Sequence, residues 1–130
     1  MSLPAGRSPD EEDSLPVLDP RISEALHFIE ANLHRPITVA DAARQAGLSR
    51  SQFSSLFRVK TGASPGRMLS KMRMELAGEL LSGKRALPMK EVAARVGFPR
   101  PEVFARAFRE WYVMTPGEFR MSRPRVHGRP

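Results

Sequence analysis

Residues 92–120 read VAARVGFPRPEVFARAFREWYVMTPGEFR, and this stretch decides the fold. Its first apolar residues have helical spacing and stop at Gly97, where a helix end needs a left-handed residue. A second helix is predicted from the Pro-Arg-Pro sequence that follows, with Phe104 and Phe108 on its buried side. Thr115 and the proline after it predict the start of a third, short helix. Two short helices around a glycine corner, the second with a polar outer face, are typical of a helix-turn-helix.

A weaker copy of this pattern lies about 50 residues earlier, over residues 39–69. Gly47 corresponds to Gly97 at an offset of 50, and after a one-residue insertion the later features recur at an offset of 51. An internal repeat is stronger evidence for two such units than a single motif would be. The pairs at the larger offset are Phe53 with Phe104, Phe57 with Phe108, and Ser64-Pro65 with Thr115-Pro116.

Helical spacing along the chain predicts an all-α, homeodomain-like fold of seven helices, with two helix-turn-helix units joined by a long linker helix. The first helix is expected to begin at Asp19 and to continue until Pro36 stops it. A linker helix of about 18 residues would measure roughly 27 Å, which is close to one turn of DNA at roughly 34 Å. The apolar stripe predicted for that helix consists of Leu69, Met72, Leu76 and Leu80, broadened by Met68, Ala77 and Leu81.

The same pattern predicts the organisation of the chain. Residues 1–18 have no helical periodicity and hold several prolines and an acidic cluster, so a disordered leader or interdomain linker is expected there. A DNA-binding domain is predicted over 19–122, followed by a basic tail over 123–130. Within the domain, the first unit is predicted over 19–62, the linker helix over 64–82 and the second unit over 87–121.

Charge and composition narrow the possible functions. The net charge is +7; residues 1–19 hold one arginine against five acidic residues, a balance of −4, so +11 remains on the rest. Such a basic surplus indicates a nucleic-acid partner, although a solvated basic face has the same composition. The chain has no cysteine, its three histidines lack ligand spacing, and no apolar run approaches the roughly 20 residues of a membrane span. We therefore predict a cytoplasmic protein with no metal, no cofactor and no catalytic residues.

Three strings carry a resemblance to a known family: AARQAGLSRSQFSSLFRVKTGASPGRML (42–69), KMRMELAGELL (71–81) and the 92–120 string above. The glycine corners, the Phe-Arg pairs and the Ser/Thr-Pro caps occur at the spacing of the AraC/XylS family of bacterial transcription regulators. The resemblance covers about residues 20–121. It implies a seven-helix domain in which two helix-turn-helix units are joined by a long helix.

The resemblance also implies roles for individual positions. Arg106 is the strongest candidate base reader, because arginine can bind guanine bidentately. Glu102 could accept from a cytosine amine or stabilise the helix N-terminus, and both alternatives stay open. The implied base contacts are Ser51, Ser54, Ser55, Glu102, Ala105 and Arg106, and the implied phosphate contacts are Thr38, Ser49, Arg50, Arg58, Lys60, Arg100 and Arg109.

The sequence departs from the family pattern at several positions. Pro99 and Pro101 replace polar residues at the start of the second recognition helix and predict a shifted first turn. Val113 stands where the family commonly has glycine, which predicts a different turn before Thr115. Ser55 replaces the usual arginine or glutamine, so the second unit is expected to dominate base reading.

The leading hypothesis is a sequence-specific DNA-binding domain of a bacterial regulator that inserts two recognition helices into successive major-groove segments and bends the double-stranded DNA. Further expectations are nucleoid association, a possible contact with RNA polymerase, and a missing effector or dimerisation domain that would make this chain the C-terminal part of a longer protein. The alternatives are a stand-alone regulator controlled by its abundance and a non-specific nucleic-acid-binding module. An enzyme is disfavoured, because related DNA-repair methyltransferase fusions need an acceptor cysteine.

Overall fold

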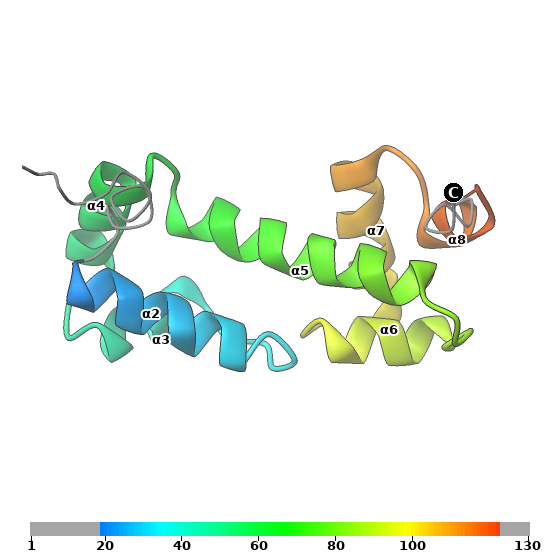
Figure 1. The fold of residues 1–130 in the computed structure, drawn as a ribbon, viewed down its shortest axis with the longest axis horizontal. Coiled ribbons are helices and arrows are strands. Elements are labelled where there is room, and N and C mark those ends of the chain that lie inside the picture. The colour runs from blue at the N-terminus through cyan, green and yellow to red at the C-terminus, as the bar shows by residue number, and fades with distance from the viewer. Residues whose placement is uncertain (1–18, 123–130) are drawn as a thin grey trace, which may run out of the picture. The chain divides into compact units, whose positions relative to one another are not determined.

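The computed structural model describes residues 19–122, and in this range every regular element is a helix (Figure 1). Seven helices are present, which confirms the predicted all-α fold. The leader predicted over 1–18 and the tail predicted over 123–130 lie outside the described residues. The helices are α2 (Pro20–Ala31), α3 (Val39–Gln45), α4 (Arg50–Thr61), α5 (Pro65–Ser82), α6 (Met89–Arg95), α7 (Pro101–Tyr112) and α8 (Pro116–Ser122).

The described chain divides into two compact units. Unit 1 comprises α2 up to Glu30 together with Thr38–Met68, and so contains α3, α4 and the first turn of α5. Unit 2 comprises Ala31–Ile37 and the chain from Leu69 onward, and so contains most of α5 and all of α6, α7 and α8. The division differs from the predicted one at residues 31–37, which had been placed in the first unit.

The core of unit 1 consists of apolar side chains from its three helices. Ile22, Ala25 and Ile29 of α2 are buried, and so are the phenylalanines at 53 and 57 of α4, whose ring centroids lie 5.5 Å apart. The small buried residues of α3 allow α3 to contact α4 closely. Gly47 makes the corner between these two helices with φ +74°, in the left-handed region that favours glycine.

Side-chain caps define where several helices begin. Asp41 N donates to the Thr38 hydroxyl (3.2 Å) while Thr38 N donates to the Asp41 carboxylate (2.8 Å), so a capping box opens α3. Ser49 forms the equivalent box for α4 with Gln52. Ser64 accepts from the amide of residue 67 at the start of α5, and Thr115 pairs reciprocally with Glu118 at the start of α8.

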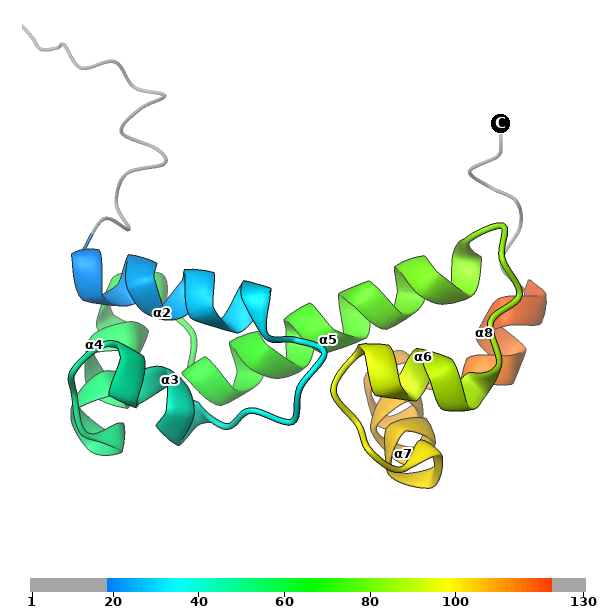
Figure 2. The same ribbon diagram turned by 90° about the horizontal axis from the view of Figure 1, so that it is seen from below.

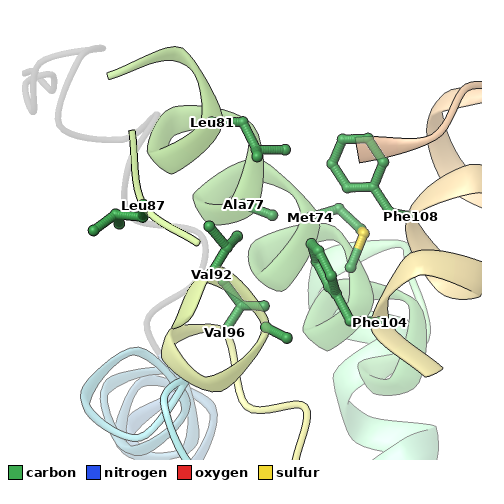
Figure 3. Packing of buried hydrophobic residues seen from close by; sticks show 9 residues of the cluster. Met74, Ala77, Leu81, Leu87, Val92, Val96, Phe104 and Phe108 are labelled. Atoms are coloured by element: carbon green, nitrogen blue, oxygen red, sulfur yellow. The ribbon is translucent and has the colours of Figure 1, made fainter. Parts of the chain in front are cut away.

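The core of unit 2 lies between α5, α6 and α7 (Figure 3). Met74 projects from α5 toward Phe104 and Phe108, and Ala77 lies beside Val92. The two phenylalanines of α7 close the other side of the core, and α8 contacts α7 (Figure 2). The buried members of this core are Met74, Ala77, Leu81, Leu87, Val92, Ala93, Val96, Phe104 and Phe108.

The predicted end of the first helix is wrong, and the stripe predicted for α5 is confirmed only in part. The first helix ends at Ala31, five residues before Pro36, and a hydrogen-bonded turn between Arg35 N and Asn32 O follows it. In the stripe predicted for α5, Ala77 and Leu81 are buried, whereas the other members are half-buried. Arg73 and Met74 are buried as well although the prediction did not include them, so the inward face is rotated relative to the centre of the predicted stripe.

The buried face of α5 includes a charged residue, Arg73, whose exposed fraction is 6%. Its guanidinium donates to four backbone carbonyls of unit 2. The Cζ atom of the guanidinium lies 5.9 Å from the ring centroid of Phe98. Burial lowers the pKa of this guanidinium. Within residues 19–122 no carboxylate forms an ion pair with it. The accepting oxygens are those of Leu33 (2.9 Å), Arg35 (3.1 Å), Ile37 (3.2 Å) and Val96 (2.6 Å).

Because Gly97 has no side chain, the guanidinium of Arg73 can occupy the space beside it. Gly97 makes the corner between α6 and α7 with φ +87°, like the corner of unit 1. A Cβ atom placed on Gly97 would lie 1.6 Å from Arg73 Nη1 and 2.5 Å from the carbonyl oxygen of Leu33. A Cβ atom placed on Gly47 would meet no atom within 4 Å. The two corners share a backbone conformation and differ in what packs against them.

This difference gives a matched pair of substitutions. Gly47→Ala should destabilise the protein by about 1 kcal/mol, the cost of a left-handed alanine. Gly97→Ala should cost on the order of 3 kcal/mol more, because it displaces Arg73 and leaves buried carbonyls without their donor. Urea denaturation of both variants measures the two losses. Equal losses would show that the corner at Gly97 does not depend on Arg73.

Candidate nucleic-acid interface

The outer face of α4 brings together the base contacts predicted for the first unit. Ser51 and Ser55 are exposed and Ser54 is half-buried. These serines line a surface hollow together with Arg50, Arg58 and Val59. Val59 is apolar but has 78% of its surface exposed. This face therefore offers three small hydroxyl groups between two cations, which can donate to or accept from many partners.

The other phosphate contacts predicted for unit 1 lie at helix ends. Lys60 is exposed in the last turn of α4. Thr38 and Ser49 are also exposed, but their hydroxyl groups accept from the backbone amides of α3 and α4. Each hydroxyl therefore stabilises its helix, and the amides of the residues directly after it are the groups left to meet a phosphate.

The outer face of α7 presents a row of charged side chains. Glu102, Arg106 and Arg109 are exposed at positions i, i+4 and i+7, which places them along one side of the helix. Ala105 is half-buried beside them. The opposite side carries Phe104 and Phe108, both buried in the core of unit 2. The core thereby determines which side chains of α7 face outward.

Arg100 precedes α7 and forms an ion pair with Glu102. Its Nε and Nη2 both lie 2.9 Å from Glu102 Oε2. The pKa of Glu102 lies below the usual carboxyl value, first because its own backbone amide donates to the carboxylate and second because Arg100 does. Arg106 contributes further positive charge to the same effect. The structure thus shows Glu102 engaged with groups at the helix start.

Helices α4 and α7 begin at equivalent positions but with different caps. Ser49 and Arg100 occupy the N-cap positions of α4 and α7, at the repeat offset of 51. Ser49 caps its helix through its side chain, whereas Arg100 makes no side-chain cap. Because both helices begin at equivalent residues of the repeat, the shifted first turn that was predicted from Pro99 and Pro101 is not present. The two prolines flank an N-cap residue that, unlike Ser49, makes no side-chain cap.

The end of α7 corrects a second expectation. Val113 caps α7 with φ +64° and ψ +25°, and its amide donates to Arg109 O at 2.8 Å. Gly62 ends α4 in the same left-handed conformation and with the same bond pattern. The turn before Thr115 therefore keeps the geometry of the first unit although a β-branched residue adopts it at a cost in strain.

Two features of this surface and its support were missed in the sequence. The Arg100–Glu102 pair has an i, i+2 spacing, which no regular helix or capping motif predicts. Arg73 was not singled out in the sequence, because the carbonyl groups that it binds lie 23 to 40 residues away along the chain. In residues 19–122 no group of three or more histidine or acidic side chains could hold a metal ion. No helix in that range has the length and apolar character to cross a membrane.

The fold and these outer faces define a domain with two helix-turn-helix units. A family model described as a helix-turn-helix domain matches residues 42–122. The chain belongs to the AraC/XylS family of bacterial transcription regulators. It is 34% identical over 93 residues to the probable transcriptional regulator LumQ of Photobacterium leiognathi, which covers 72% of this chain and 37% of LumQ.

Another relative and two solved structures support the same assignment. A putative AraC-like transcription regulator of Streptomyces antibioticus is 31% identical, covering 78% of this chain and 33% of that protein. The C-terminal domain of AraT, a response regulator from Geobacillus stearothermophilus, has a TM-score of 0.76 at 30% identity and covers 82% of this chain and 88% of that one. The DNA-binding domain of AdpA, solved with a target DNA, has a TM-score of 0.71 at 30% identity, covering 78% and 90%. The chain spans about a third of the length of the two curated relatives.

The left-handed cap of α7 gives a stability prediction. Val113→Gly should stabilise the protein by about 1 kcal/mol, because glycine adopts this conformation without the Cβ penalty. Little packing is lost, since 84% of the Val113 surface is exposed. The matched control is Gly62→Val, which should destabilise the protein by a similar amount. Thermal unfolding measures both, and an unchanged or lower midpoint for Val113→Gly would contradict the strained cap.

Proposed function

We propose that this chain is a sequence-specific binding domain for double-stranded DNA within a bacterial transcription regulator. Membership of the AraC/XylS family carries this proposal, and the neighbour solved with its target DNA supports it. The charge supports it as well, because a net charge of +7 favours approach to the phosphate backbone.

In this proposal α4 and α7 act as recognition helices. Each follows a glycine corner, is held by two buried phenylalanines, and presents polar side chains outward. A helix of this kind fits the major groove, where each base pair offers a distinct set of donors and acceptors. The two helices would enter successive major-groove segments, and a bend in the DNA stays a prediction.

The residue roles follow from side-chain chemistry and exposure. Arg106 is proposed to read guanine, because it is exposed in the middle of α7 and carries a planar fork of donors. The serines of α4 are proposed to contact bases with little discrimination, since a hydroxyl both donates and accepts. The exposed cations at the edges of the two faces are proposed to contact phosphates; these are Arg50, Arg58, Lys60 and Arg109.

The other functions considered have less support. A non-specific nucleic-acid-binding module would account for the charge, but it would not require two matched helix-turn-helix units. An enzyme would need a nucleophile or a metal site, and the family is one of transcription regulators. We propose that the domain acts without catalysis, at the bacterial nucleoid. Contact with RNA polymerase and an effector-sensing or dimerisation domain stay predictions from the sequence.

Selection of binding sites from random duplex DNA tests the proposed function. The 130-residue chain is mixed with the random duplexes and competitor DNA at near-physiological salt, and bound sequences are recovered. Two enriched blocks about one helical turn apart are expected if both helices read bases. Recovery of no enriched sequence, with binding that simply weakens as salt rises, would contradict sequence-specific binding by this chain.

Arg106→Ala gives the residue-level prediction. If Arg106 reads guanine, the variant should lose about 5- to 150-fold of discrimination at one base pair and keep its preferences elsewhere. The control is Lys60→Ala, which should weaken binding to all sequences alike and lower the salt dependence by about one counterion. Competition titrations with the selected duplex and single-base-pair variants measure both. A uniform loss for Arg106→Ala would assign that residue to the phosphate backbone instead.

A further inference from the structure

We propose that Arg100 reads a guanine base in the major groove and that Glu102 is a positioning residue for its guanidinium. This inference rests on the proposed function, because it concerns the same face of α7. It changes the predicted role of Arg100 from phosphate contact to base contact. It also decides between the open alternatives for Glu102, which then neither reads cytosine nor acts solely on the helix N-terminus.

The geometry of the ion pair supports this division of roles. Glu102 Oε2 accepts a hydrogen bond from Arg100 Nε and lies at the same 2.9 Å from Nη2 in an ion pair, so the carboxylate occupies one edge of the planar guanidinium. The other edge, formed by Nη1 and Nη2, makes no hydrogen bond within the described residues. That edge holds two parallel N–H donors, the pattern that pairs with O6 and N7 of guanine. A guanidinium held in this way loses less rotational freedom on binding than a free arginine does.

The backbone around Arg100 is restricted as well. Arg100 has φ −120° and ψ +123°, in the extended region. Pro101 disfavours the helical region for the residue before it, and Pro99 fixes its own φ on the other side. The side chain therefore leaves the chain from a well-defined position at the start of α7. Both the backbone and the carboxylate limit the directions that the guanidinium can take.

The pair has no evident role in stabilising the fold. Side-chain exposure is 69% for Arg100 and 60% for Glu102, and an exposed ion pair contributes little to stability. Arg100 also occupies the N-cap position, where a serine, threonine, aspartate or asparagine would stabilise the helix. The first unit has such a residue at the equivalent position, Ser49, with a complete capping box. Arginine at this position makes no side-chain cap, and it places an oriented cation at the N-terminus of α7.

Glu102 by itself is poorly suited to contact DNA. Its carboxylate is negative, accepts from its own amide and from Arg100, and has Arg106 nearby. An unpaired carboxylate on this face would be repelled by the phosphates, whereas the pair with Arg100 presents a cation and its donors. The positive charge around Glu102 keeps the carboxylate ionised, which preserves the bond that orients Arg100.

The test uses Arg100→Lys in the full chain, with binding-site selection and competition titrations. Lysine keeps the charge but lacks the planar fork, so it separates the two roles. We expect guanine preference at one base pair, different from the Arg106 base pair, to fall by about 5- to 150-fold while the salt dependence stays unchanged. If every positional preference survives in Arg100→Lys, Arg100 is a phosphate contact and the inference is wrong.

Glu102→Ala tests the positioning role, and Glu110→Ala is its matched control. Both remove one exposed carboxylate from α7, so both change the net charge equally. Glu102→Ala should reduce the guanine preference at the Arg100 base pair several-fold, and it should have no further effect when Arg100 is already lysine. Glu110→Ala should leave all positional preferences unchanged. Loss of a cytosine preference at another base pair in Glu102→Ala would instead make Glu102 a base reader and contradict the inference.

Failure of this inference is distinguishable from failure of the proposed function. If the unmodified chain selects no sequence, the proposed function fails and the inference fails with it. If it selects a sequence and only the Arg100 and Glu102 variants behave otherwise than expected, the proposed function stands and the inference alone fails. Far-ultraviolet circular dichroism of each variant checks that the helices are intact.

Discussion

Unit 2 depends on one buried guanidinium, that of Arg73, which bonds to four backbone carbonyls. A buried cation without hydrogen-bond partners would be very costly, and these oxygens supply the partners in place of a carboxylate. Three of the oxygens belong to the segment between α2 and α3, and the fourth belongs to Val96 at the end of α6. The Arg73 side chain therefore binds both the segment over 33–37, which has no regular structure, and the corner that precedes α7.

This constraint also affects the outer face of α7, through Gly97. The corner must have a left-handed residue, and that residue must lack a Cβ atom because the guanidinium lies against it. Two residues further on, Pro99 begins the approach to α7, and the buried phenylalanines at 104 and 108 set the rotation of the helix about its axis. The outward direction of Arg106 thus follows from interactions made on the opposite, buried side.

The equivalent helices α4 and α7 of the two units differ in the residues at both of their ends. In unit 1 both ends of α4 have favourable residues, with Ser49 capping its start and Gly62 in the left-handed position at its end. Unit 2 has Arg100 and Val113 at the equivalent positions, and both are unfavourable for the helix. In our proposal the change at Arg100 serves base recognition. Nothing in the structure explains the valine at 113.

Much of the fold could be predicted from the sequence because its signals are local. Thr38, Ser49 and Thr115 act within one helical turn, and the glycine corners need only a positive φ, so each could be recognised from a few neighbouring residues. Arg73 could not, since its partners lie 23 to 40 residues away in sequence. The part of the inward face of α5 that Arg73 and Met74 form was not predicted either. Glu102 could be placed on the outer face, but its pairing with Arg100 depends on rotamers that a pattern does not contain.

Methylation interference on a selected duplex is the measurement that tests the central claim, major-groove recognition by α7, most directly. Dimethyl sulfate methylates guanine at N7 in the major groove and adenine at N3 in the minor groove, so it reports which groove is read. The account predicts that methylation of specific guanines blocks binding, and that substitution of Arg106 abolishes the interference at one of them. Interference confined to adenines, or guanine interference that Arg106 does not influence, would contradict recognition through this face of α7.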